Sequence, residues 1–407
     1  MLERIEISSD AEIYADTRAQ TTITLRGKFV ETRIETSGGL RLKSRHGNCD
    51  EVRLTSDLTQ TPLPNHPTPL SEESLTQITN LARQLFPEHP RLVYRTLRLT
   101  LTTHHYEVLC PGGDLQRAVE EKACLETEWV VREKDGTRTF RETSARRNWK
   151  ELVNDLKPGQ WLGETIALTL RPPPVWPVPD GDIPIYWSPR AVAKICLPFL
   201  RAFEGDTLLD GRSLLADWPK DVALPFTIEE TPVPAIDHEG QVTRPLVLFD
   251  GRRPRALLVD KTLAGTFAVE STGHARRGTY RERNEVLSWG AEIVAAVEAV
   301  ATLPEWGLSV RDVELSEVNP RTGRMSLRLR DARLLHHGVE GEAIEPITLE
   351  ISLLDLMRSW RAFSKDTETF GQMLSKHAVS HLTELKTPGA LSPQVRLQGQ
   401  VPPEHYW

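Results

Sequence analysis

The stretch STGHARRGTYRERN, residues 271–284, places hydroxyl, imidazole and guanidinium groups beside glycines on what the sequence predicts to be a loop. Gly273 would let another backbone approach closely, and the neighbouring hydroxyls and amides can bond an extended peptide as an added strand. The two adjacent arginines can hold carboxylates in bidentate fashion, on a substrate or on a partner subunit. The candidate substrate- or partner-binding residues are therefore Ser271, Thr272, Gly273, His274, Arg276 and Arg277.

The positive charge of this stretch extends over residues 244–283, which contain nine Lys and Arg residues against four Asp and Glu residues. The whole chain, in contrast, carries a formal net charge of −7. Three interpretations stay open: a solvated hairpin and loop, a surface that binds a peptide or partner, and a nucleic-acid site. Nucleic acid is disfavoured because Tyr280 is the one Phe, Tyr or Trp residue within 271–284 that could stack on a base.

Histidines raise the question of a metal site. A zinc hydrolase needs about three protein ligands, an open water position and usually a carboxylate base. None of the twelve histidines begins an HExxxH motif. In HAVSH, His377 and His381 would face one side of a helix, which makes them weak metal candidates, the alternative being a polar surface segment. The adjacent pairs at 104–105 and 336–337 would point to opposite faces of strands, so neither pair can chelate one ion.

The elements that position these groups begin with a strand-rich segment. Residues 21–36 alternate polar and apolar side chains, and Gly38–Gly39 is expected to form a turn. Residues 75–85 have helical spacing after Ser71 as a cap. Further along, the sequence predicts a proline-rich loop at 61–70, a strand at 94–103, a hairpin at 126–144 around Asp135–Gly136, and a short helix near 149–156.

Six prolines in residues 170–184 predict a stiff, extended linker. We therefore expect an α+β protein with three parts: an N-terminal α/β domain over 1–170 with a mixed or antiparallel sheet, a linker over 171–184, and a β-rich C-terminal domain over 185–407. The second half should contain a helix at 188–203 kinked by Pro198, a hairpin at 245–260, strands at 325–335 and 343–353, and a helix at 353–363.

Composition narrows the class of protein. With 407 residues, 39% hydrophobic and 26% charged, the chain can bury cores and is not disordered. The four cysteines form no CxxC, which is typical of reduced thiols in an intracellular protein. The charged start MLERIEISSD lacks an apolar signal-peptide region, and no run of about 20 apolar residues suggests a membrane span. We expect a cytoplasmic protein.

The order of motifs in the second half resembles that of the TldD/PmbA family. It begins with DHEGQVTRPLVLFDGRRPRALLVDKTLAGTFAVESTGHARR (237–277), which contains the D-x-E-G turn, a strand pair ending in LLVD and the STGxARR loop. It continues with the N-x-x-T-G turn and strands of 317–363 and with ALSPQVRLQG (390–399), which is similar to the family's closing strand. The N-terminal strands are also similar to the family's opening strands.

This resemblance implies an activity shared between two subunit types. TldD-type subunits resemble zinc metalloproteases, with an HExxxH helix and a later cysteine as ligands. TldE-type subunits, also called PmbA, lack these ligands and pair with TldD to close a chamber around a peptide. In the family the metal helix is followed by Glu-Gly-Asp. Aligning that tripeptide with residues 204–206 places CLPFLR (196–201) at the metal motif.

The aligned residues cannot form the family's zinc site. Cys196 stands for the first histidine, Leu197 for the base and Arg201 for the second histidine. Leucine cannot act as a base, a guanidinium cannot ligate zinc because it stays protonated, and no cysteine follows Cys196. The resemblance therefore implies a metal-free, TldE-like subunit, with zinc in a TldD-like, HExxxH-bearing partner and an extended, unfolded peptide as substrate. A stand-alone peptide-binding homodimer and an active metallopeptidase with a non-standard site remain as alternatives.

Overall fold

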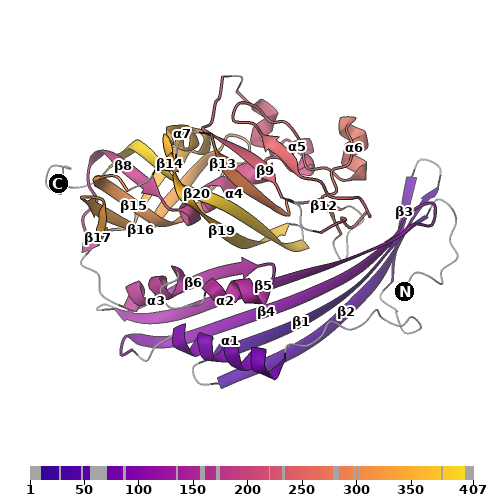
Figure 1. Ribbon diagram of the computed structural model, residues 1–407, viewed down its shortest axis with the longest axis horizontal. Helices are drawn as coiled ribbons and strands as arrows, with labels where there is room; N and C mark the ends of the chain where they lie inside the picture. The colour runs from indigo at the N-terminus through magenta and orange to yellow at the C-terminus, as the bar shows by residue number, and fades with distance from the viewer. Residues whose placement is uncertain are drawn as a thin grey trace.

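The first 146 residues contribute a six-stranded antiparallel sheet of long, curved strands in the order β3-β2-β1-β4-β5-β6 (Figure 1). Its strands are β1 (Ala11–Arg26), β2 (Phe29–His46), β3 (Cys49–Thr55), β4 (Leu92–Leu109), β5 (Leu115–Glu133) and β6 (Gly136–Arg146). The computed structural model describes residues 11–26, 29–46, 49–55, 71–85, 89–133, 136–155, 161–170, 175–219, 221–231, 234–277, 284–296, 299–300, 303–376 and 379–398.

Strict alternation along these strands separates two faces of the sheet. Odd-numbered apolar residues such as Leu97, Leu125 and Trp129 are buried under three helices. The even-numbered residues, among them His104 and Glu120, lie on the opposite face, which is turned toward the C-terminal half (Figure 1). The three helices are α1 (Glu72–Leu85), α2 (Trp149–Asp155) and α3 (Trp161–Leu170).

Most of the predicted N-terminal elements are confirmed, with one error of register. The strand at 94–103 lies within β4, the helices fall in α1 and α2, and the Ser71 hydroxyl accepts a hydrogen bond from the Ser74 amide at 3.2 Å. The turn expected at Gly38–Gly39 is wrong, because both glycines lie inside β2 opposite Thr17 and Asp16. The chain instead reverses between Arg26 and Phe29, which are paired across the two strands. The loop predicted at 61–70 falls outside the described residues.

A twelve-stranded mixed sheet forms the C-terminal half. Its main path runs β10-β9-β13-β20-β8-β15-β16-β17-β7, with β14, β18 and β19 attached beside it. Its strands are β7 (Val175–Trp176), β8 (Gly181–Trp187), β9 (Phe226–Glu230), β10 (Leu246–Phe249), β13 (Gly290–Ala295), β14 (Ala299–Val300), β15 (Trp306–Ser316), β16 (Arg324–His336), β17 (Val339–Ile344), β18 (Ile347–Ser352), β19 (Ala362–Lys376) and β20 (Val379–Leu397). These two sheets and their helices confirm the α+β class.

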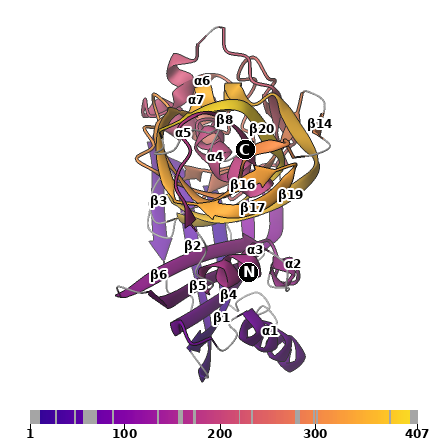
Figure 2. The same ribbon diagram turned by 90° about the vertical axis from the view of Figure 1, so that its left-hand side faces the viewer.

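Helix α4 (Pro189–Arg201) lies in the centre of this half, and β8, β16, β17, β19 and β20 curl around it (Figure 2). The Ser188 hydroxyl caps the helix by accepting a hydrogen bond from the Ala191 amide at 3.2 Å, and Pro189 occupies the first turn, where no amide donor is needed. Ten of its thirteen residues are buried, as expected for a helix enclosed by a sheet. Pro198 lies inside the helix.

Several other C-terminal predictions need correction. Part of the proline-rich segment 171–184 belongs to the sheet, because β7 pairs with β17 and β8 lies between β15 and β20. The hairpin at 245–260 has β10 as its first arm, but its second arm is irregular and leads into helix α6 (Lys261–Phe267). The helix at 353–363 ends earlier, as α7 (Leu353–Ser359), and the strand β19 follows it.

The two halves are held together by buried charges and by a close backbone approach. Glu142 of β6 forms ion pairs with Arg190 of α4 at 2.8 Å and with Arg330 of β16 at 2.9 Å. Gly371 of β19 lies so close to Ala145 of β6 that a Cβ atom there would overlap the Ala145 carbonyl oxygen. Strand β6 is therefore packed directly against the C-terminal sheet.

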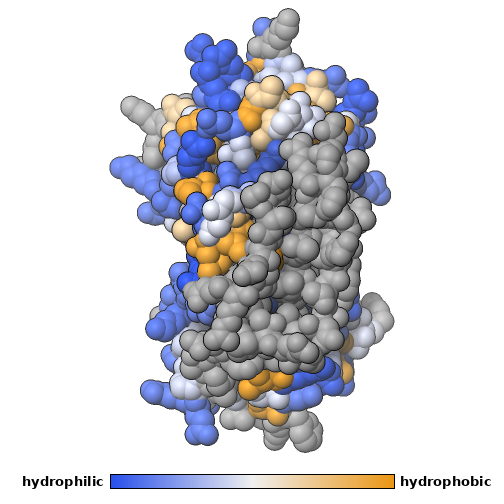
Figure 3. All heavy atoms as spheres, turned by 90° about the vertical axis from the view of Figure 1, so that its right-hand side faces the viewer, coloured by the Kyte–Doolittle hydropathy of each residue, from blue (hydrophilic) through white to orange (hydrophobic). Residues whose placement is uncertain are grey.

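Long apolar helices are absent from the part of the chain that the structure describes. Among the described helices, none combines the length and the hydropathy that crossing a membrane requires. On the face at the end near α6, the described residues are mainly hydrophilic, with separate apolar areas between them (Figure 3).

Candidate functional site

The loop that begins at Ser271 is fixed by backbone contacts. Thr272 exchanges hydrogen bonds with Val259, its amide donating to the Val259 carbonyl at 3.1 Å while its hydroxyl accepts from the Val259 amide at 2.8 Å. Gly273 has φ +75°, and a Cβ atom there would lie 2.8 Å from the Val242 carbonyl oxygen. Glycine is therefore required at this position for two reasons: the left-handed backbone conformation and the close approach of the Val242–Thr243 backbone.

His274 is fully buried and hydrogen-bonded. Its Nδ1 lies 3.1 Å from the Thr272 hydroxyl, and its Nε2 lies 3.2 Å from Oε1 of the equally buried Glu230. Glu230 also accepts hydrogen bonds from the Ser288 hydroxyl at 2.8 Å and the Trp289 amide at 2.8 Å. These contacts make His274 part of the packed interior.

Arg276 and Arg277 reach from the loop to the first sheet. The short strand β11 (Ala275–Arg276) pairs with β12 (Glu285–Val286), and Arg276 Nη1 donates to Glu120 Oε2 at 2.7 Å. Arg277 is paired with Glu12, which also lies 3.2 Å from Lys261 Nζ. Both arginine side chains are buried, so in this structure their charges join the two halves of the chain.

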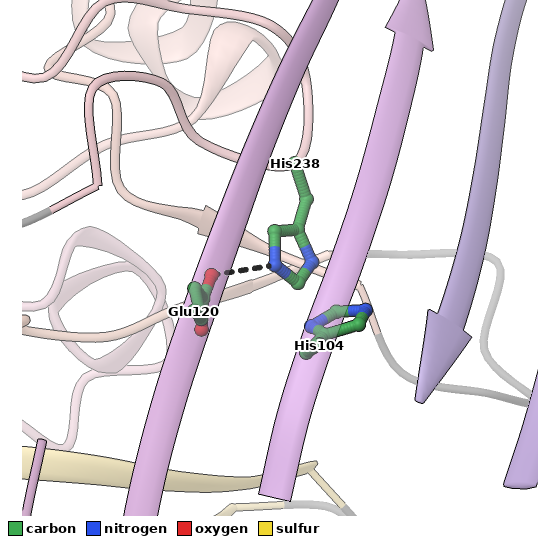
Figure 4. Close-up of side chains that lie close together, drawn as sticks. All are labelled: His104, Glu120 and His238. Carbon is green, nitrogen blue, oxygen red and sulfur yellow. Dashed lines mark hydrogen bonds and ion pairs between the residues drawn. The ribbon is translucent and has the colours of Figure 1, made fainter. Parts of the chain in front are cut away.

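A cluster of three side chains that the loop motif did not predict lies beside these ion pairs. It consists of His104, Glu120 and His238 (Figure 4). His104 of β4 and Glu120 of β5 are direct cross-strand partners, and His238 comes from the turn of the D-x-E-G motif. His238 Nε2 lies 3.2 Å from Glu120 Oε1. One ligand-type atom of each residue lies within 4.8 Å of the other two, so the three groups could converge on one ion.

Aromatic and acidic side chains surround this cluster. The Tyr14 hydroxyl lies 3.2 Å from His104 Nε2 and 3.5 Å from His238 Nδ1, and Asp16 Oδ2 lies 3.0 Å from His104 Nε2. Tyr106 packs with its ring centroid 4.6 Å from that of His238, and its hydroxyl donates to the Ile236 carbonyl at 2.7 Å. Burial raises the pKa of both tyrosines well above the usual value.

The environment also fixes the charges of the three central groups. Burial lowers the pKa of His238 to about 4, against a smaller opposing effect of Glu120. Burial likewise lowers the pKa of His104. Burial alone would raise the pKa of Glu120, but the charge of Arg276 and the hydrogen bond from His238 hold it well below the usual range. At neutral pH the cluster thus consists of two neutral imidazoles and one carboxylate.

The hydrogen bonds of His238 determine which of its ring nitrogens carries the proton. His238 Nδ1 accepts the Arg277 amide hydrogen at 3.0 Å, so its proton is on Nε2 and is donated to Glu120. A metal ion at Nε2 would require the other tautomer, which would place an Nδ1 proton against the Arg277 amide hydrogen. Glu120 is moreover already paired with the Arg276 guanidinium. The donor set therefore fits a hydrogen-bonded network better than a metal centre.

Helix α4 does not supply the family's zinc ligands either. Cys196 is completely buried, and burial raises the pKa of its thiol. Leu197 and Arg201 border a cavity beside α4, where they offer a hydrocarbon chain and a guanidinium in place of a base and an imidazole. We derive no catalytic step through a metal at this helix.

The helical geometry expected for HAVSH is wrong. Strand β19 ends at Lys376 and β20 begins at Val379, and these two residues are paired across a hairpin. His381 lies buried in β20, and His377 falls outside the described residues. Residues 379–381 therefore lie in a strand, so the helical face on which the metal suggestion for His377 and His381 depends is not formed there.

Two features of the sequence point to this cluster. His238 and Glu239 form a His-Glu pair, although Thr243 stands where HExxxH requires its second histidine. The alternation of β4 and β5 also predicts that His104 faces one side of the sheet, but its partner Glu120 depends on register. Long-range pairing of this kind cannot be read from spacing along the chain.

The basic segment 244–283 is largely neutralised by carboxylates of the same chain. Arg244 pairs with Glu270 at 2.9 Å and Arg255 with Asp250 at 2.5 Å. Lys261, Arg276 and Arg277 have the partners described above, and residues 278–283 fall outside the described part of the chain. Five of the seven described Lys and Arg residues of the segment therefore form ion pairs within the chain.

Comparison with known proteins identifies the family. Residues 180–399 match the PmbA/TldA metallopeptidase C-terminal domain, which is more than half of the chain, and the chain therefore belongs to the PmbA/TldD family. A search of curated proteins finds no match.

Solved structures show the same fold over nearly the whole chain. TldE from Thermococcus kodakarensis is 15% identical with a TM-score of 0.71, and the match covers 96% of each chain. A proposed modulator of DNA gyrase from Bacteroides thetaiotaomicron is 15% identical with a TM-score of 0.71, covering 96% of this chain and 94% of that one. A second such protein, from Thermotoga maritima, is 14% identical with a TM-score of 0.72, covering 95% of each chain. At these identities the likeness establishes the fold.

Proposed function

We propose that this chain is a non-catalytic, metal-free, TldE-like subunit of a cytoplasmic metallopeptidase complex. It completes a chamber in which a TldD-like, HExxxH-bearing partner supplies the zinc ion, the water and the base. The complex degrades or trims unfolded peptides. The chain contributes walls that position an extended substrate.

One observation carries this proposal. The chain contains the family's metallopeptidase domain, yet its sequence has no HExxxH motif, and the helix enclosed by its sheet carries Cys196, Leu197 and Arg201 where the resemblance implies that motif. A buried thiol, a hydrocarbon chain and a permanently protonated guanidinium cannot bind and activate zinc-bound water. The structural likeness to a protein named TldE supports the same assignment.

The experiment compares the purified chain, its nearest HExxxH-bearing homologue from the same genome, and an equimolar mixture. Zinc content is measured by mass spectrometry, association by light scattering, and peptidase activity with a fluorogenic unstructured peptide. We expect the chain alone to be zinc-free and inactive and the mixture to be an active, zinc-bearing hetero-oligomer. A homologue whose HExxxH glutamate is replaced by glutamine provides the inactive control.

Two results would overturn the proposal. A chain that binds zinc stoichiometrically and cleaves the peptide alone is a metallopeptidase, and the His104→Ala and His381→Ala variants would then locate its ligands. If the chain forms a homodimer, binds the peptide and does not associate with the homologue, it is a stand-alone binding protein.

A further inference from the structure

Two cavities of similar size share part of their lining. The first, of about 650 Å³, lies beside α4 and is bordered by Leu197, Pro198 and Arg201. The second, of about 660 Å³, lies between the halves, with β6 and α3 on one side and β16 and β17 on the other. Figure 2 shows β16 and β17 above β6 and α3, the elements that border the second cavity.

Glu314 and Arg330 border both cavities, so the two adjoin, and we call them together the α4–β6 groove. A single cavity of this size suits a drug-sized ligand. Two adjoining cavities offer lining for an extended segment of several residues.

The groove is strongly cationic in a chain whose net charge is −7. Nine cationic side chains border it against four carboxylates. The cations are Arg91, Arg138, Arg141, Lys194, Arg201, Arg212, Arg328, Arg330 and Arg333, and the carboxylates are Glu142, Asp312, Glu314 and Asp331.

Three of the four carboxylates are already occupied. Glu142 pairs with Arg330 and Arg190, Asp312 lies 2.6 Å from Lys194 Nζ, and Asp331 lies 3.3 Å from Arg333 Nε. They neutralise the cations beside them, and Arg141 and Arg212 pair with Glu128 and Asp210 outside the lining. The remaining cations are in excess.

Arg201 and Arg328 carry the excess charge. The carboxylate paired with Arg201 is Glu204, at 3.9 Å. Arg328 is exposed, and among the described residues no ion pair involves it. A ligand that brings carboxylates into the groove would complete the coordination of both guanidinium groups.

The remaining walls favour a peptide. Leu197, Val313, Leu315 and Leu374 line the cavity beside α4 and can receive apolar side chains. Stacking of bases would need exposed aromatic faces. Phe140 is the one aromatic residue among the described lining residues, and it stacks on Trp129 with ring centroids 5.5 Å apart and also faces Arg138.

We propose that the α4–β6 groove binds an extended acidic peptide segment in which carboxylates alternate with apolar side chains. This inference rests on the proposed function only in taking such a segment to be the substrate of the complex. Binding itself is a property of the isolated chain.

The test uses fluorescence anisotropy with the isolated full-length chain. The probe is a labelled ten-residue peptide alternating Glu with Leu and Ser, and its matched control has Lys in place of Glu. Arg201→Gln, Arg328→Gln and the double variant are compared with Arg361→Gln, which removes an exposed arginine that does not line the groove. Thermal melts verify that each variant is folded.

We expect the acidic peptide to bind and the lysine peptide to fail. The double variant should weaken binding by roughly tenfold or more, and Arg361→Gln should leave it unchanged. Equal binding of both peptides, unchanged affinity of a folded double variant, or tighter binding of a labelled oligothymidine would each overturn the inference.

Its failure can be told apart from failure of the proposed function. If the mixture with the homologue cleaves peptides and the double variant cleaves acidic and neutral peptides as before, the subunit role stands and the groove assignment falls. If the chain binds the acidic peptide through these arginines but never supports the homologue, the groove assignment stands and the subunit role falls.

Discussion

At the scale of single residues, Gly273 is the most constrained position of the STGHARR loop. Its φ of +75° and the 2.8 Å approach of the Val242 carbonyl to a Cβ position leave no room for a side chain. We expect Gly273→Ala to lower the free energy of unfolding by about 2 kcal/mol or more, measured by urea denaturation. Gly265→Ala in α6, where a Cβ would contact nothing within 4 Å, is the control and should be neutral or slightly stabilising.

His238 should make stability depend on pH. Its pKa is lowered by burial to about 4 from 6.5, so the unfolded chain takes up a proton that the folded protein refuses. The stabilisation is complete above pH 6.5 and is lost as the pH falls toward 4, amounting to about 3 kcal/mol at most. We expect His238→Gln to be less stable than wild type at pH 7.5 but to lose less stability on acidification.

The neighbouring Glu239 affects the pH dependence of stability in the opposite direction. The comparison of wild type with His238→Gln removes this effect. Burial, Asp260 and Asp237 raise its pKa to about 7, so its contribution is present at low pH and lost as the pH rises through 7. Because Glu239 is present in both proteins, its effect cancels in the difference between wild type and His238→Gln. Parallel stability curves between pH 4 and 7 would contradict the prediction.

At the scale of elements, α4 depends on its first turn. The Ser188 hydroxyl accepts from the Ala191 amide and donates to the Arg311 carbonyl at 2.8 Å, so it both caps the helix and ties it to β15. We expect Ser188→Ala to cost about 1–2 kcal/mol in urea denaturation. Ser352→Ala removes the longer, 3.4 Å cap of the short helix α7 and should cost less. If Ser352→Ala lowered the free energy of unfolding more than Ser188→Ala did, the cap of α4 would not be the more important of the two.

Elements whose periodicity is local could be predicted from the sequence, and those decided by distant partners could not. The spacing of apolar residues was sufficient for α1 and α4, because one face of each helix repeats over several turns. Gly38–Gly39 looked like a turn, but pairing with β1 keeps both glycines in a strand. HAVSH had helical spacing by coincidence within a hairpin.

In the candidate site, too, contacts between residues far apart in the chain could not be predicted from the sequence. The loop residues were located from their motif, but their partners Glu12, Glu120 and Glu230 are between 44 and 265 residues away along the chain. Whether an arginine faces solvent or a buried carboxylate depends on such contacts, and residue type alone does not decide it. The interpretation of Arg276 and Arg277 as groups that grip a ligand stays a prediction.

At the scale of the whole molecule, Glu142 links the two halves. Its carboxylate is buried with Arg190 and faces Arg330, so neutralising it leaves guanidinium charges inside the protein without their main partner. We expect Glu142→Gln to lower the free energy of unfolding by about 3 kcal/mol in urea denaturation. Asp217→Asn, which breaks an exposed pair with Arg321, should cost less than about 1 kcal/mol. Equal losses would mean that the junction is not stabilised by this charge.

The two distinct faces of the N-terminal sheet restrict the insertions and deletions that β4 and β5 can accept during evolution. In β4 and β5, odd positions pack under the helices and even positions carry His104, Glu120 and their neighbours toward the other half. An insertion or deletion of one residue within either strand would exchange the faces of everything beyond it, placing leucines in the polar network and histidine under the helices. Homologous genes should therefore vary in the identity of these residues while keeping the spacing between them, with gains and losses of codons confined to the turns.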